Sequence, residues 1–116
     1  MDIKVVFHLD WDNEDPLTMA LNNMENLLKE VPAENAAIYL VANGVAVKLF
    51  RREPAKPYAS RIERLSANGV HFLLCNNSLR NLGIKRDDLM AQCEVVPAGI
   101  LELINLQHEG FAYIKP

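Results

Sequence analysis

The order of the secondary-structure elements is set first by residues 3–42, IKVVFHLDWDNEDPLTMALNNMENLLKEVPAENAAIYLVA. Ile3 to Leu9 is a short apolar run rich in β-branched residues, which is typical of a strand. Asp15-Pro16 has the character of a helix N-cap followed by proline at the first helical position, and apolar residues then recur at helical spacing from Leu17 to Leu28. Ala36 to Ala42 is apolar almost throughout, as in a strand covered on both faces. The stretch therefore predicts a strand–helix–strand unit with parallel strands.

The same alternation continues to the end of the chain. Residues 45–50 fit either a short helix or an extended segment, and residues 51–57, which hold two prolines, are expected to form a loop. Further strands are expected at 70–74, 94–96 and 111–114, and further helices at 58–67, 76–82 and 100–108. We therefore expect one α/β domain over residues 1–116 with a mainly parallel sheet.

The composition excludes several classes of protein. Half of the 116 residues are apolar and 23% are charged, which is typical of a globular domain. No apolar run reaches the roughly 18 residues of a membrane span, and the N-terminus does not have the pattern of a signal peptide. The acidic pI of about 5.6 and the absence of basic–aromatic interleaving disfavour nucleic-acid binding. Two cysteines are too few for a disulfide scaffold, so we expect a cytoplasmic protein.

Polar residues gather where the predicted strands end and the next segments begin. In open α/β sheets, ligands bind at this edge, which makes a pocket there plausible. The corners are 8–12, 43–44, 75–78 and 97–100. The candidate ligand-binding residues at these corners are His8, Asp10, Asn43, Gly44, Asn76, Asn77, Ser78 and Gly99.

Cys75 is the candidate catalytic residue. It ends a predicted strand just before a helix, where backbone N–H groups stabilise a thiolate, and a thiolate can attack a sulfane sulfur and carry it as a persulfide. Residues 51–86 hold eight Lys or Arg against two Glu, and Arg80, Lys85 or Arg86 can add a positive field. The alternative interpretation is a buried structural cysteine, which is common for free thiols. Cys93 has no helix start beside it and is interpreted as structural.

The sequence supports other kinds of chemistry less strongly. His8 and Asp10 can form an acid–base pair only if the strand stays regular, and a histidine at a strand end more often satisfies local hydrogen bonds. The acidic residues between Asp10 and Asp15 lack the glycine and glutamate of a calcium loop, so no metal is expected. Neither a dinucleotide fingerprint nor a P-loop is present, and no cofactor is predicted.

Several segments resemble the DsrE-like family of small sulfur-relay proteins. They are FHLD at 7–10, LVANGVAVKLF at 40–50, CNNSLRNLGI at 75–84 and VVPAGILELINLQHEGFAYIKP at 95–116. The resemblance implies a three-layer α/β/α sandwich with a five-stranded, mainly parallel sheet, assembled as homotrimers or hexamers. It also implies that Cys75 stands where relay members accept persulfide sulfur from a donor protein and pass it to an acceptor protein.

Two functional hypotheses are therefore consistent with the sequence. The first is a sulfurtransferase or persulfide carrier that uses Cys75, rather than a turnover enzyme. The second is a non-catalytic oligomeric module that binds a small ligand at the strand ends, with Cys75 lining the pocket. For either function we expect a homo-oligomer, because Val45, Val47, Leu49 and Phe50 exceed what a short crossover should bury and would form an exposed interface.

Overall fold

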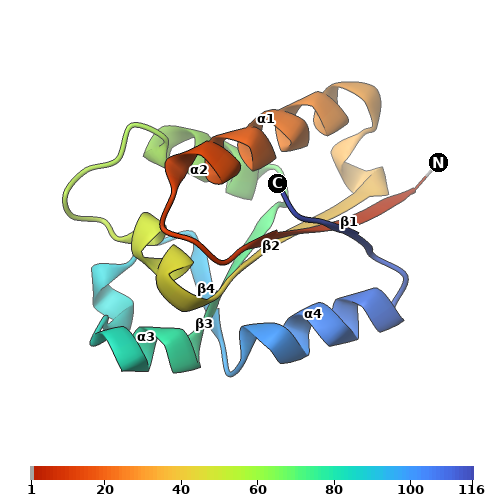
Figure 1. The fold of residues 1–116 in the computed structure, drawn as a ribbon. Coiled ribbons are helices and arrows are strands. Elements are labelled where there is room, and N and C mark those ends of the chain that lie inside the picture. Colours follow the sequence, from red (N-terminus) through yellow and green to blue (C-terminus); the bar gives the residue numbers. More distant parts are fainter. Residues whose placement is uncertain (1) are drawn as a thin grey trace.

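The computed structural model describes residues 2–116 and has a sheet of five parallel strands with helices on both sides (Figure 1). The strand order is β4-β3-β2-β1-β5. The strands are β1 (Ile3–Leu9), β2 (Ala36–Ala42), β3 (His71–Cys75), β4 (Cys93–Val96) and β5 (Ala112–Ile114). The α-helices are α1 (Glu14–Glu30), α2 (Ala59–Ala67), α3 (Asn76–Leu82) and α4 (Gly99–His108), and the 3₁₀ segments are η1 (Ala33–Asn35), η2 (Gly44–Phe50) and η3 (Arg86–Asp88). The predicted α/β sandwich is confirmed.

The two faces of the sheet carry separate apolar clusters. In the larger one, Phe7, Leu40 and Phe72 of three neighbouring strands pack against residues of α1, α2 and η2. In the smaller one, Val6, Val41 and Leu73 face Leu103 and Leu106 of α4. Figure 1 shows α1 and α2 on one side of the sheet and α4 on the other. Residues alternate between the faces along each strand, which explains why almost every strand position is apolar.

The start of α1 differs from its prediction. The N-cap is Asn13, whose side-chain oxygen accepts a hydrogen bond from the Asp15 N–H at 2.9 Å. The predicted cap at Asp15 is wrong because Asn13 has the extended backbone of an N-cap, and the helix has already begun at Glu14. Two helices end at glycines with positive φ, Gly69 at 93° and Gly83 at 67°, a conformation in which glycine is favoured.

Residues 44–50 do not form the exposed interface that was predicted from their apolar side chains. They form η2, in which Val47, Leu49 and Phe50 are buried in the larger cluster and Val45 is half-buried. These side chains fill the space between the sheet and α3 rather than forming an exposed patch, so the interface predicted there is wrong. Within residues 2–116, no helix is long and apolar enough to cross a membrane.

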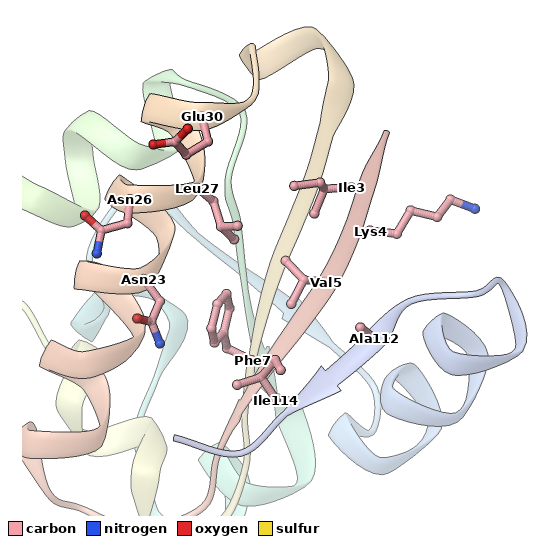
Figure 2. Close-up of a pocket in the computed structure, with 10 residues that line it drawn as sticks. All are labelled: Ile3, Lys4, Val5, Phe7, Asn23, Asn26, Leu27, Glu30, Ala112 and Ile114. Atoms are coloured by element: carbon pink, nitrogen blue, oxygen red, sulfur yellow. The ribbon is translucent and has the colours of Figure 1, made fainter. Parts of the chain in front are cut away.

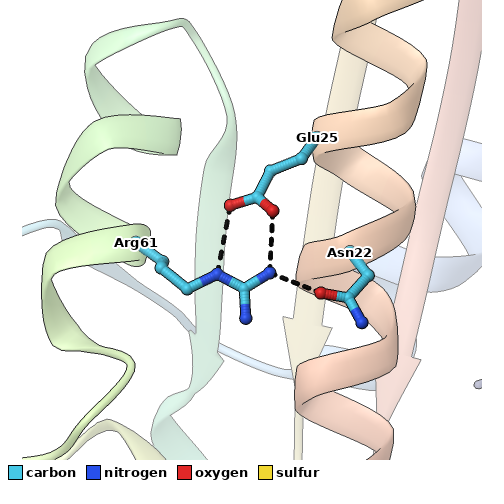
Figure 3. Close-up of polar contacts among 3 residues, drawn as sticks. All are labelled: Asn22, Glu25 and Arg61. Carbon is cyan, nitrogen blue, oxygen red and sulfur yellow. Dashed lines mark hydrogen bonds and ion pairs between the residues drawn. The ribbon is translucent and has the colours of Figure 1, made fainter.

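A polar contact fixes α2 against α1. The Arg61 guanidinium donates to both carboxylate oxygens of Glu25, at 2.8 and 3.1 Å, and to the side-chain oxygen of Asn22 at 2.6 Å (Figure 3). This hydrogen bonding lowers the pKa of Glu25 although partial burial opposes it. The bidentate geometry orients the two helices as well as attracting them.

Candidate functional site

The carboxyl edge of the sheet brings most of the predicted residues together. The register pairs Ala42 with Leu74, so Asn43 follows β2 opposite Cys75 at the end of β3. Val41 and Leu73 belong to the α4-side cluster, and Asn43 and Cys75 lie two residues further along each strand, on the same face. Gly99, the first residue of α4, lies between them. A β-carbon built on Gly99 would lie 3.1 Å from the Asn43 Cβ and 3.3 Å from the Cys75 Cβ.

Hydrogen-bond donors near Cys75 lower the pKa of its thiol. Burial acts to raise the pKa of the thiol, but the Ser78 hydroxyl and the backbone N–H groups of Gly99, Ser78 and Asn77 outweigh it, and the pKa is lowered. The Ser78 Oγ also accepts a hydrogen bond from the Gly44 N–H at 2.7 Å, which leaves its own proton free for the sulfur. Because neutral donors favour the charged form of the thiol, Cys75 has the surroundings of a thiolate.

Cys93 has the opposite surroundings. It is packed in the larger apolar cluster, and burial raises its pKa to about 12, with only the Arg86 charge opposing. Both thiols are free and almost equally covered, with 6% of Cys75 and 5% of Cys93 exposed. The predicted positive field of Arg80, Lys85 and Arg86 does not account for the Cys75 shift, whose favourable causes are all neutral groups. The two cysteines therefore differ in how deeply they are buried and in the polar groups beside them.

His8 and Asp10 use separate partners rather than each other. The His8 Nδ1 lies 2.5 Å from the Tyr113 hydroxyl, and its Nε2 lies 2.8 Å from the Asn43 Oδ1. Asp10 pairs with Lys115 at 2.9 Å, and this contact lowers the pKa of the Asp10 carboxyl. The structure therefore shows His8 satisfying local hydrogen bonds, the alternative that was left open.

The remaining predicted residues contribute to the site mainly through their backbone N–H groups. Gly44 has a positive φ of 60° and turns the chain so that its N–H meets Ser78. The half-buried Asn76 and exposed Asn77 begin α3, and Asn77 supplies the N–H noted above. Among residues 2–116, no group of three His, Cys, Asp or Glu side chains is arranged to hold a metal ion.

A cavity of about 470 Å³ lies elsewhere, between α1, β1 and β5 (Figure 2). Val5 and Phe7 form its apolar floor, and Asn23 and Leu27 of α1 line the opposite wall. None of the predicted ligand-binding residues lines it. The cavity therefore gives no support to a ligand pocket beside Cys75.

Sequence reasoning missed Tyr113 and Lys115. Tyr113 lies on β5 and Lys115 lies two residues further along the chain. Because β5 pairs with β1 in parallel, Tyr113 contacts His8 of β1, and Lys115 contacts Asp10 just after β1. The sequence predicted the strand but gave no strand order, so nothing connected these residues with His8 and Asp10.

Comparison with known proteins gives the family. The model of the DsrE/DsrF-like family matches residues 12–116. MTH1491 from Methanobacterium thermoautotrophicum, described as a protein of unknown function, is 36% identical to the chain, with 99% of this chain and 100% of that one aligned and a TM-score of 0.89. No curated protein matches.

Two more distant structures share the fold. The ychN protein from E. coli is 21% identical over 98% of this chain and 99% of its own, with a TM-score of 0.79. BT1422 from Bacteroides thetaiotaomicron is 17% identical over 97% and 94%, with a TM-score of 0.69. Given the family match over nearly its whole length, the chain belongs to the DsrE/DsrF-like family.

Proposed function

We propose that the protein is a sulfur-relay carrier in which Cys75 accepts persulfide sulfur from a donor protein and passes it to an acceptor protein. The observation that supports this proposal is the position of Cys75 at the end of β3 and the start of α3, next to Gly99 of α4, where the Ser78 hydroxyl and the N–H groups of Gly99, Ser78 and Asn77 lower the pKa of its thiol. Family membership supports it.

The step requires a thiolate but no cofactor. The Cys75 thiolate attacks the outer sulfur of a donor persulfide, an S–S bond forms at Cys75 and the donor's S–S bond breaks. The donor leaves as a thiolate, and the proton of its outer sulfur moves with that sulfur. Delivery repeats the exchange with an acceptor thiolate, so Cys75 is regenerated and the protein acts as a carrier rather than a turnover enzyme.

The second candidate, a ligand-binding module, is favoured by one observation. Only 6% of Cys75 is exposed, and a ligand-binding module tolerates a buried thiol, whereas a carrier needs an accessible one. Against this alternative, two of the side chains predicted to bind a ligand are engaged, because His8 bonds Tyr113 and Asn43, and Asp10 pairs with Lys115.

Mass spectrometry after incubation with glutathione persulfide tests the proposal. The wild-type protein and Cys93→Ser are expected to gain about 32 Da, one sulfur atom, and Cys75→Ser to gain nothing. Cys93→Ser is the matched control because both cysteines are free and similarly covered. Sulfur uptake that survives in Cys75→Ser would contradict the proposal, as would a wild-type protein that takes up none.

We further infer that the protein is a cytoplasmic homo-oligomer, with a trimer as the first choice on family grounds. Ile100, Leu101 and Ile104 form an apolar patch on the outer side of α4, with 44–60% of each residue exposed. α4 covers the strand residues of the smaller cluster with its inner side, so the exposed apolar residues on its outer side take no part in that core. A second copy would cover them, and the α4 patch is the surface we assign to it.

A further inference from the structure

The four residues Tyr113, His8, Asn43 and Cys75 form a row across the α4 face of the sheet. His8 follows Val6, and Asn43 follows Val41, by two residues each, and both valines belong to the α4-side cluster. Tyr113 pairs in register with Val6, and Asn43 falls opposite Cys75. The row therefore connects the last strand to the reactive thiol through side chains of neighbouring strands.

Among the described residues, the Asn43 carboxamide is hydrogen-bonded through its oxygen only. Its Oδ1 lies 2.8 Å from the His8 Nε2, and a carboxamide oxygen can only accept, so Nε2 carries the proton. The His8 Nδ1 then accepts from the Tyr113 hydroxyl at 2.5 Å. The amide nitrogen of Asn43 donates to no protein group within residues 2–116, although Asn43 is half-buried. Asn43 also makes no side-chain capping bond to η2, so its side chain has no part in starting that segment.

The side chains of Asn43 and Cys75 start close together at the same edge of the sheet. A β-carbon built on Gly99 would be in contact with the β-carbons of both residues, so these two carbons flank one narrow gap. An added sulfur extends the Cys75 side chain by about 2 Å, the length of an S–S bond. The Asn43 amide nitrogen is two bonds beyond its own β-carbon, so each side chain has only a short span to cover for the amide and the outer sulfur to meet.

We propose that the Asn43 amide binds the outer sulfur of the Cys75 persulfide, with His8 and Tyr113 positioning the amide. This inference rests on the proposed function. The donors already present, from Ser78, Asn77 and Gly99, surround the inner sulfur. Once the outer sulfur has lost its proton it carries the charge, and it needs a donor of its own, which Asn43 provides as a charge-assisted hydrogen bond.

The test compares the thiol form with the persulfide form in Asn43→Leu. Its rate of alkylation by iodoacetamide at Cys75 should stay within about twofold of wild type, because the donors to the inner sulfur remain. After loading with glutathione persulfide, the half-life of the added sulfur should fall about tenfold, as expected for the loss of one hydrogen bond to a charged group. Asn105→Leu, an exposed asparagine on α4, is the matched control and should behave as wild type.

Two further variants complete the test. Asn43→Asp keeps the oxygen that His8 contacts but replaces the amide donor, so it should also lose the added sulfur quickly, and it serves if Asn43→Leu does not fold. Tyr113→Phe should shorten the half-life less, since His8 remains. If wild type loads and both Asn43 variants hold sulfur as long as it does, the role of Asn43 is overturned and the carrier function stands. If wild type does not load, both are overturned.

Discussion

Cys75 and Cys93 differ in pKa because Cys93 lies deeper in the apolar core and lacks the hydrogen-bond donors near Cys75. Each keeps about the same small exposed fraction, yet donors from Ser78, Asn77 and Gly99 lower the pKa of Cys75, while burial raises that of Cys93 to about 12. A thiol can therefore be nearly covered and still have a lowered pKa, provided that polar groups lie beside it. Gly99 is central to this setting, because a β-carbon there would lie only 3.1 and 3.3 Å from the β-carbons of Asn43 and Cys75, a tight fit.

The sequence predicts those parts of the site whose residues lie close together in the chain or at aligned strand ends. Cys75, Ser78 and Asn77 are close in the chain, so a strand end followed by a helix start was enough to place them together. Gly99 and Asn43 were predicted at the same edge, because parallel strands align their ends. Tyr113 was not predicted, because its contact with His8 depends on β5 returning beside β1, and strand order is decided by packing over the whole sheet.

At the scale of elements, every predicted strand and α-helix is present with ends within two residues, because apolar runs and caps are local signals. The predictions failed where packing decides. The apolar residues of η2 are core rather than interface, since α3 and the sheet cover them. The α1–α2 contact through Arg61 and Glu25 likewise could not be read from the sequence, since the two residues lie far apart in the chain.

That contact gives a prediction for stability. Because the pKa of Glu25 is lowered in the folded protein, its contribution is complete above the ordinary value of 4.5 and is lost as the pH falls through the folded value. Glu25→Gln should therefore lower the free energy of unfolding by up to about 1 kcal/mol at pH 7, a small value because both side chains are partly exposed. Near pH 3 the difference in free energy of unfolding between the wild-type protein and Glu25→Gln should be smaller.

Urea unfolding at the two pH values measures this difference. Glu63→Gln on α2 is the control, because Glu63 is exposed and forms no hydrogen bond or ion pair within the described part of the chain. An equal loss of stability for Glu25→Gln at both pH values would show that the ion pair is not the cause.

At the scale of the whole molecule, the α4 patch and the Cys75 site are continuous. Gly99 contacts the site, and the exposed Ile100 and Leu101 follow it directly in the first turn of α4. A second copy that covers the patch would thus lie beside the start of α4, next to Cys75. The proposed assembly and the proposed relay are therefore expected to influence each other.

Ile104→Glu tests the assembly. A carboxylate within the patch should be costly to bury, so the oligomer should dissociate at micromolar concentration while the monomer keeps its fold. Light scattering gives the mass, and circular dichroism checks the fold. Met19→Glu is the matched control, because Met19 is also exposed, at 54%, but on α1. A wild-type protein of monomer mass would contradict the proposed oligomer.

The reactivity of Cys75 is tested by measuring the rate of alkylation of each cysteine as a function of pH. Iodoacetamide labelling followed by peptide mass spectrometry should show Cys75 reacting at least about tenfold faster than Cys93 near neutral pH, with a midpoint below that of an ordinary thiol. Ser78→Ala should move this midpoint upward, because it removes a donor to the sulfur. Equal and slow labelling of both cysteines in the wild-type protein would contradict the account.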